Sequence, residues 1–296
     1  MGGAERHIRR VGVEFLRATS WADALATKAA RPDALPIAGG TDVMVDINFD
    51  RCRPPALLDL NPVAALRDWD RDNGTVVIGA GVPYTRLIDE LGADLPGLAT
   101  ASRTVGSPQI RNRGTLGGNL GSASPAGDTH PVLLALSATV EAESARGSRD
   151  IPIDDFYLGV KRSALAPDEL IRAVRVPVGT GPCHFAKIGT RNAMVIAVCS
   201  FAIALHVEAR AVRTGIGSAA PTPRRSAEAE AFAAAELDWS GGPLSERTAR
   251  RFGELAASAA VPISDVRGTA AYRRHAVAVL ARRTLRWAWE EYRACA

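Results

Sequence analysis

Clustered metal ligands are absent from this chain of 296 residues. Its four cysteines are scattered, and no C-x-x-C pair occurs among Cys52, Cys183, Cys199 and Cys295. The five histidines are equally dispersed, and H-E-x-x-H is missing. Zinc and iron–sulfur sites need ligand pairs close in sequence to fix their geometry. We therefore predict that the chain holds no metal ion or cluster of its own.

Lysines, aromatic residues and long apolar runs are also scarce. The chain has only three lysines and 5% aromatic residues, and charges of both signs are mixed although the formal net charge is +4. A nucleic-acid surface requires clustered basic residues interleaved with aromatic ones, so nucleic acid is not an expected partner. The longest apolar run, 193–205, is shorter than the roughly 20 residues of a membrane span. With no visible targeting segment, we expect a cytoplasmic protein without a membrane span.

What the chain does contain is a regular alternation of strand and helix patterns. In residues 1–62, strand, helix, strand, glycine turn, helix and strand follow one another, which is the order of parallel pairing. Ser20 is the expected N-cap of a helix over 21–30. Residues 63–178 predict a larger mixed sheet. Its expected elements are strands at 75–81 and 170–177, a hairpin turn at Asn73-Gly74, and helices at 83–92, 95–105 and 128–137.

The best linker candidate lies near Gly179 to Pro182. Beyond it we expect two apolar strands, at 194–207 and 211–220, followed by helices at 225–236, 245–260 and 269–293. The last helix is amphipathic, and we expect it to turn Val277 and Trp287 inward.

Two pairs of adjacent glycines carry the main functional signal. Gly39-Gly40 follows an apolar strand and precedes Thr41, and Gly117-Gly118 precedes Asn119. Without side chains, successive N–H groups can point the same way and a ligand can approach the backbone. The first turn opens into a helix at 41–42, an arrangement that suits a phosphate or pyrophosphate. An ordinary tight turn explains either pair alone, but two such pairs favour a long ligand wrapped by both.

The common nucleotide loops do not explain these glycines. No Gly-Lys pair occurs, so a P-loop is excluded. Residues 215–220, GIGSAA, fit the expression G-x-G-x-x-A, but Pro221 and Pro223 prevent a helix from starting there. If a dinucleotide binds, it does not bind by a Rossmann turn.

Other polar residues near these segments leave alternatives open. Asp128 precedes a helix, where it is either the N-cap or an acceptor for ribose hydroxyls or a ring N–H. Lys187 is a surface lysine by default. Arg111 and Arg113 flank the second glycine pair and can balance the charge of a diphosphate. No Ser-His-Asp or Cys-His arrangement stands out, so we expect no covalent catalysis and no catalytic residue.

Three segments occur in an informative order: PIAGGTDVM (36–44), IRNRGTLGGNLGSASPAGD (110–128) and FAKIGTR (185–191). Together they resemble the FAD-binding medium subunit of the molybdenum hydroxylases, the family of xanthine dehydrogenase and carbon monoxide dehydrogenase. The resemblance extends to 156–171, 217–225 and 265–283, and so covers nearly the whole chain.

The resemblance implies an α+β (mixed α/β) fold. Its first part is a FAD-binding domain of the vanillyl-alcohol-oxidase or PCMH type over 1–178, made of two α/β subdomains at about 1–62 and 63–178. Its second part is a C-terminal domain over 179–296, built from an antiparallel sheet and helices and similar to that of carbon monoxide dehydrogenase flavoproteins.

The resemblance also implies the cofactor site. In the family both glycine turns wrap the FAD pyrophosphate, an aspartate contacts the cofactor, an apolar residue lines the isoalloxazine, and a lysine lies near the flavin. Neither glycine turn contains a histidine, which favours non-covalent FAD. The matching residues here are Ala38, Gly39, Gly40, Thr41, Asp42, Thr115, Gly117, Gly118, Asn119, Asp128, Leu165 and Lys187.

Finally, the resemblance implies partners. A molybdopterin-binding large subunit would hydroxylate the substrate, and a 2Fe–2S small subunit would pass electrons to this FAD and on to NAD⁺, oxygen or a quinone. The assembly would be a dimer of heterotrimers. Carbon monoxide dehydrogenases usually read A-G-G-[QH]-S-L where this chain reads A-G-G-T-D-V-M, which favours the xanthine or purine branch. The alternatives are a carbon monoxide or aldehyde dehydrogenase subunit, a standalone flavin-dependent oxidase, and a scaffold that has lost FAD.

Overall fold

The first sheet is parallel, as the order of its elements predicts. In the computed structural model, which describes residues 12–179 and 181–295, β1 (Glu14–Arg17) and β2 (Leu35–Ile37) pair with β3 (Ala56–Asp59) between them. Helix α1 (Trp21–Ala30) connects β1 to β2, and α2 (Val43–Asn48) precedes β3. The Ser20 hydroxyl accepts the N–H of Asp23 at 3.1 Å, so the predicted N-cap is confirmed.

The second sheet has five strands, and all of its pairs are antiparallel, so the prediction of a mixed sheet was wrong. Its strands lie in the order β4–β5–β10–β6–β7. These are β4 (Trp69–Asp72), β5 (Thr75–Gly79), β6 (Thr139–Ser144), β7 (Gly147–Pro152) and β10 (Leu170–Pro177). Asn73 (φ 46°) and Gly74 (φ 76°) are both left-handed, which is the geometry of a tight hairpin turn.

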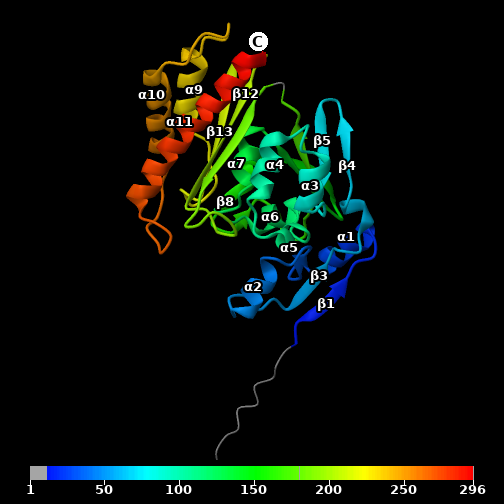
Figure 1. Ribbon diagram of the computed structural model, residues 1–296. Coiled ribbons are helices and arrows are strands. Elements are labelled where there is room, and N and C mark those ends of the chain that lie inside the picture. Colours follow the sequence, from blue (N-terminus) through cyan, green and yellow to red (C-terminus); the bar gives the residue numbers. More distant parts are fainter. Residues whose placement is uncertain (1–11, 180, 296) are drawn as a thin grey trace, which may run out of the picture.

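Short helices cover one side of this sheet and carry part of the candidate site (Figure 1). They are α3 (Tyr84–Glu90), α4 (Pro96–Arg103), α5 (Pro108–Arg111), α6 (Leu116–Ser122), α7 (His130–Ala135) and α8 (Ile153–Phe156), with a 3₁₀ turn, η1, at Ala64–Leu66. A small hairpin of β8 (Tyr157–Gly159) and β9 (Arg162–Ser163) follows α8. The buried residues of the parallel sheet, the five-stranded sheet and these helices form one continuous apolar core.

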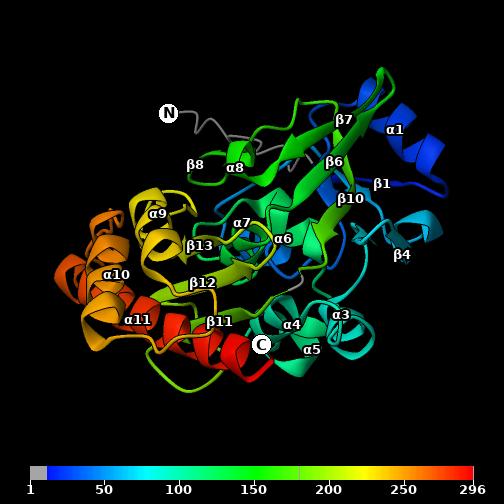
Figure 2. The same cartoon turned by 90° about the horizontal axis from the view of Figure 1, so that it is seen from above.

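The third sheet is antiparallel, in the order β11–β12–β13. Its strands are β11 (Cys183–Ile188), which we did not predict, β12 (Cys199–His206), which begins five residues later than predicted, and β13 (Ala211–Gly217). Helices α9 (Ala227–Glu236), α10 (Glu246–Ser258) and α11 (Ala270–Cys295) lie on one face, and α4 and α7 lie on the other (Figures 1 and 2). In α11 Val277 is buried as predicted, but Trp289 is the buried tryptophan and Trp287 is exposed.

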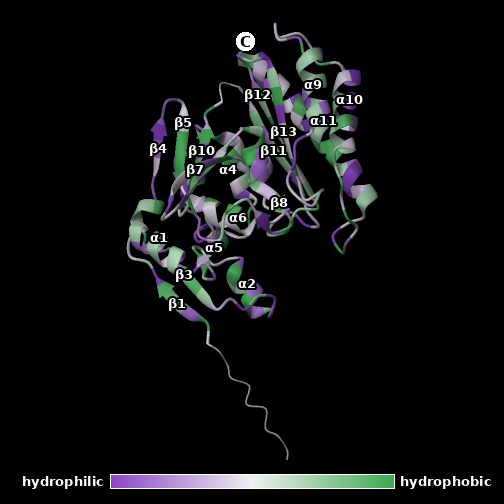
Figure 3. Cartoon of the chain, turned by 180° about the vertical axis from the view of Figure 1, so that it is seen from behind, coloured by the Kyte–Doolittle hydropathy of each residue, from purple (hydrophilic) through white to green (hydrophobic). Residues whose placement is uncertain are grey.

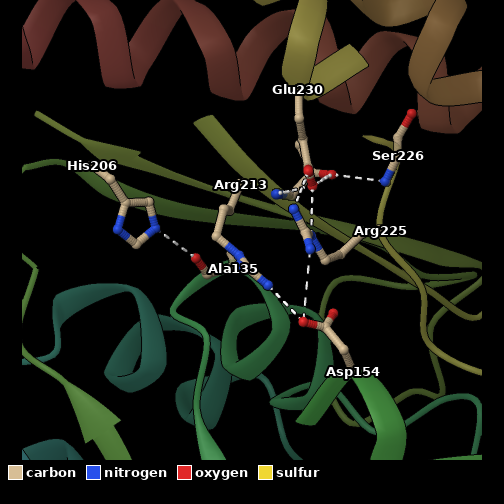
Figure 4. A network of polar contacts seen from close by, with 8 residues as sticks. Ala135, Asp154, His206, Arg213, Arg225, Ser226 and Glu230 are labelled. Atoms are coloured by element: carbon tan, nitrogen blue, oxygen red, sulfur yellow. Dashed lines mark hydrogen bonds and ion pairs between the residues drawn. The ribbon is translucent and has the colours of Figure 1, made fainter. Parts of the chain in front are cut away.

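Polar contacts tie this third sheet to the preceding part of the chain (Figure 4). Asp154 of α8 accepts from Arg213 of β13 at 2.6 Å and lies 3.7 Å from Arg225. Arg225 in turn pairs with the buried Glu230 of α9. On the same sheet, His206 lies 3.1 Å from the carbonyl oxygen of Ala135 in α7. These contacts hold the third sheet against the helices that form the candidate site.

No helix in the described residues combines the length and apolar character that a bilayer crossing requires. Within 12–179 and 181–295, no three His, Cys, Asp or Glu side chains are grouped so that they could hold a metal ion.

Candidate functional site

The first glycine turn is an irregular segment between β2 and α2. Gly40 has φ +74°, a conformation that strains residues with a side chain. Outside helices and strands, none of the backbone hydrogen bonds of the described residues uses the N–H of Gly39, Gly40 or Thr41 as a donor. The carbonyl of Ala38 accepts from the Asn61 amide at 2.8 Å, which fixes the start of the turn. This turn therefore offers backbone donors to a ligand.

The second glycine pair is not the separate turn that we predicted, because it lies inside the first turn of α6. Thr115 is the N-cap, and its hydroxyl accepts the N–H of Gly118 at 2.9 Å. The N–H of Gly117 donates to the carbonyl of Ala80 at 3.1 Å, and that of Asn119 to the carbonyl of Thr115 at 3.0 Å. A Cβ on Gly117 would overlap Ala80, so a glycine is needed for α6 to lie this close to the end of β5.

The two glycine segments meet, although 76 positions separate Gly39 from Thr115. A Cβ on Gly39 would overlap the carbonyl oxygen of Arg113, two residues before the α6 N-cap. Asn61, which holds Ala38, also lies 3.4 Å from the Arg113 guanidinium through its side-chain oxygen. The expectation that both segments face one ligand is therefore compatible with their positions in the fold.

Asp128 and Lys187 form a buried ion pair across the two halves of the chain. Their charged atoms lie 2.5 Å apart, and the side chains are 7% and 9% exposed. The Lys187 ammonium also donates to the Thr104 carbonyl at 3.1 Å, and the Thr104 hydroxyl donates to Asp128 at 3.0 Å. Asp128 is thus not an N-cap; Thr129 precedes α7 and makes no side-chain cap bond. Lys187 is not a surface lysine.

Burial affects the ionisation of the Asp128 carboxyl. Removal from water raises the pKa of the Asp128 carboxyl, and the Lys187 ammonium and the Thr104 hydroxyl oppose that rise. One carboxylate oxygen, Oδ2, receives both of these contacts. The other, Oδ1, is buried and has no hydrogen-bond partner among the described residues. A buried carboxylate oxygen without a donor is costly, so it marks a place where a ligand group can bind.

Other buried polar atoms without partners lie nearby, and our reading of the sequence missed them. They belong to Tyr84, His130 and Tyr157. Tyr84 adjoins the second glycine segment, since its N–H donates to the Gly114 carbonyl at 3.0 Å. Burial raises the pKa of its hydroxyl. The available signal in the sequence was its position three residues after the predicted strand at 75–81.

His130 stacks at 5.0 Å from the Tyr157 ring. Complete burial of the imidazole lowers its pKa to about 4. A histidine inside the apolar run that follows Asp128 was the available signal in the sequence.

The remaining predicted residues are less closely tied to this centre. Asp42 stands at the start of α2 without a side-chain cap bond. Leu165 is half-buried against the core on the segment between β9 and β10. Arg111 donates to the carbonyls of Arg103, Val105 and Gly106, so its charge is used to hold the chain before α5. Of the two flanking arginines, Arg113 is the one that adjoins both glycine segments.

The residues fit a bound FAD. The first turn presents unbonded N–H groups, the second segment adjoins it, and the Asp128 Oδ1 and Tyr84 hydroxyl are buried without partners among the described residues. A dinucleotide with a long, polar, charged middle can satisfy such groups.

Comparison with known proteins identifies the family of both halves of the chain. Residues 10–179 match the FAD binding domain in molybdopterin dehydrogenase, and residues 184–288 match the CO dehydrogenase flavoprotein C-terminal domain. The chain is 30% identical to the xanthine dehydrogenase FAD-binding subunit of Escherichia coli O157:H7, over 92% of this chain and 94% of the relative. It is 32% identical to the nicotine 6-hydroxylase medium subunit of Paenarthrobacter nicotinovorans, over 92% and 96% of the two chains.

Solved structures share the whole fold. A chain of the reconstituted CO dehydrogenase from Oligotropha carboxidovorans superimposes with a TM-score of 0.86 at 29% identity, covering 96% of this chain and 99% of that one. The matches span both halves, including the third sheet and its helices. The chain therefore belongs to the family of FAD-binding medium subunits of the molybdopterin dehydrogenases, which includes xanthine and CO dehydrogenases.

Proposed function

We propose that this chain is the electron-transfer subunit of its complex, which takes electrons from 2Fe–2S clusters of a small partner subunit and passes them to NAD⁺ or another acceptor. The observations that support this most are the unbonded N–H groups of the first turn and the buried Asp128 Oδ1, which has no hydrogen-bond partner among the described residues. Bound FAD would supply the redox chemistry, because it exchanges electrons both singly and in pairs. The chain itself needs no general base or nucleophile.

In this proposal each predicted residue has a binding role. The first turn, Ala38 to Asp42, would donate backbone N–H groups to the pyrophosphate, and Thr115 to Asn119 would lie against its other side. Asp128 would accept hydrogen bonds from the cofactor through Oδ1, Leu165 would line the ring system, and Lys187 would supply a positive charge beside it. Because Lys187 and Asp128 already neutralise each other, the pair would orient the cofactor at little net cost in charge.

We further propose that the complete complex is a dimer of heterotrimers that hydroxylates xanthine or a related purine at the molybdenum of its large subunit. The A-G-G-T-D-V-M sequence of the first turn favours this branch. Relatives that act on other substrates, such as the glyceraldehyde dehydrogenase medium chain of Sulfolobus acidocaldarius at 31% identity, define the alternatives. Steady-state assays of the assembled complex with xanthine, CO and aldehydes test this assignment. Turnover of CO or aldehyde without xanthine would overturn it.

The cofactor assignment is tested first on the purified chain. We expect flavin absorption bands that pass into the supernatant after acid precipitation, which is the behaviour of non-covalent FAD. Flavin retained in the precipitate would contradict non-covalent binding. A colourless chain that also fails to bind added FAD, alone and in the complex, would overturn the proposed function.

The acceptor and the partner dependence are tested by kinetics. Stopped-flow oxidation of the reduced complex by NAD⁺ and by O₂ separates the two acceptors. If the isolated chain reduced its own flavin with a small substrate, the standalone oxidase would replace the electron-transfer subunit.

A further inference from the structure

Exposed apolar side chains gather on one side of this molecule. Eleven of the fourteen exposed large apolar residues in the described part of the chain lie within segments 44–49, 158–160, 194–196 and 261–272. Phe49 is 69% exposed and Val266 is 99% exposed. In Figure 3, α2 is coloured largely as apolar, yet none of its residues is buried. We call the exposed apolar residues of these four segments the apolar rim.

Two of the four segments meet at the end of α6. The backbone N–H of Lys161, in the β8–β9 hairpin, donates to the carbonyl of Ala123 at 3.2 Å. The Lys161 ammonium lies 2.8 Å from the carboxylate of Asp46 in α2. The hairpin therefore joins the helix that carries the second glycine pair to the helix that follows the first.

The other two segments are fixed by one buried arginine. Arg273, at the start of α11, donates to the carbonyls of Val198 at 2.7 Å and Ser218 at 2.6 Å. Val198 ends the loop that follows Lys187, and the N–H of Ser218 donates to the carbonyl of Pro125, shortly before Asp128. All four segments are thus tied to residues next to the candidate site, and in Figure 1 they lie on the side where α2 and the turn before α11 project.

The charges around the apolar rim are unequal. Segments 42–53, 157–163, 189–198 and 261–272 contain six basic and four acidic side chains. Three of the acidic ones, Asp46, Asp50 and Asp265, have ion-pair partners within these segments. Among the described residues, Arg162 and Arg191 have no carboxylate partner. The surface around the rim is therefore complementary to an acidic partner.

We propose that the apolar rim is the docking surface for the iron–sulfur subunit of the complex, through a face of that subunit that is apolar at its centre and acidic at its edge. This proposal rests on the proposed function. An apolar centre with methionine and aromatic residues, surrounded by charge, is the composition of a protein interface, and monomers rarely expose such a patch. A second copy of this chain is a poorer occupant, because a two-fold interface would oppose the same basic excess to itself.

The test uses the complex assembled from co-expressed subunits, in which the iron–sulfur subunit is identified by mass and by its 2Fe–2S electron paramagnetic resonance signal. Two rim variants are Leu158→Glu with Val160→Glu, and Ile263→Glu with Val266→Glu. The matched control is Val13→Glu with Phe15→Glu, two exposed apolar residues at the start of β1, outside the rim. We expect each rim variant to weaken binding of the iron–sulfur subunit by about 30-fold or more. The control should bind it like the unmodified chain, and all variants should keep their FAD content and Tm.

Rim variants that still retain the iron–sulfur subunit would overturn the proposal, as would selective loss of the large subunit. If the isolated chain were a dimer that the rim variants turned into a monomer, a second copy would be the occupant and the proposal would be wrong. Loss of FAD binding in the unmodified chain would contradict the proposed function instead, so the two failures are distinguishable.

Discussion

The two glycine pairs of this chain lie in segments that meet in the fold, but their local structures differ. Gly39-Gly40 lies in an irregular turn with a left-handed residue and with N–H groups that have no acceptor in the described part of the chain. Gly117-Gly118 lies in a helix, and its N–H groups are bonded within the protein. The first Gly-Gly pair therefore leaves N–H donors free for a ligand, whereas the second allows α6 to pack closely against the end of β5.

The supports of the two segments differ as well. Asn61 holds the first through a single hydrogen bond to Ala38. The segment that follows the second is anchored by the Asp128–Lys187 ion pair and by the buried His130. We therefore expect changes near the second segment to affect folding, whereas changes in the first should affect ligand binding more than folding.

The largest effect is expected for Lys187→Met. It leaves the Asp128 carboxylate buried without its counter-charge, which costs about 3–5 kcal/mol of unfolding free energy. Urea denaturation followed by circular dichroism at pH 8 measures the loss. The double variant Lys187→Met with Asp128→Asn should recover part of it, because no charge is then buried alone. Equal stability of Lys187→Met and the unmodified chain would mean that the pair contributes nothing.

Gly39→Ala should weaken FAD binding by about 100-fold, or nearly 3 kcal/mol, because the new methyl group forces the first turn away from the Arg113 carbonyl. Fluorescence titration with FAD measures the affinity. Gly121→Ala is the matched control in α6, since a Cβ there meets nothing within 4 Å. Similar affinities in the two variants would show that the contact between the glycine segments is not needed for binding.

The pH dependence of stability should identify His130. Its folded pKa of about 4 lies below the unfolded value near 6.5, so the unfolded chain binds the proton more tightly. The stability is complete above pH 6.5 and falls as the pH drops from 6.5 to 4, by about 3 kcal/mol in total. His130→Phe should flatten this part of the profile in denaturation experiments from pH 7 to 4. An unchanged slope would mean that His130 is protonated in the folded protein.

Asn61→Ala should have the smallest effect. It removes the hydrogen bond to the Ala38 carbonyl, worth about 1 kcal/mol, and leaves the second segment untouched. We expect a fewfold lower FAD affinity with little change in Tm. A fall in Tm as large as that of Lys187→Met would contradict the idea that the first turn is only locally supported.

Local patterns in the sequence predicted the local structure well. The Ser20 cap, the parallel order of the first sheet and the Asn73-Gly74 turn each depend on residues close in sequence. The strands β6 and β7 were missed because neither shows an apolar run. In β6, buried residues alternate with partly exposed ones, and β7 is almost entirely polar. Trp287 was chosen over Trp289 because a helical pattern alone does not fix which face meets the sheet.

The candidate site was harder to predict from the sequence, because its residues are far apart along the chain. The two glycine pairs were found by their composition, but the helix that contains the second was not. Asp128 and Lys187 are 59 positions apart, and the strand that positions Lys187 was not predicted. Whether Tyr84 and Asp128 have partners is a property of the packed structure alone.

The position of Lys187 on β11 has a consequence for recombination between relatives. The first family match ends at residue 179 and the second begins at 184, which makes this junction an inviting place to join fragments of different origin. A chimaera joined there takes the aspartate from one parent and its lysine from the other. Such exchanges should give a stable protein only between parents that have both residues in the same register.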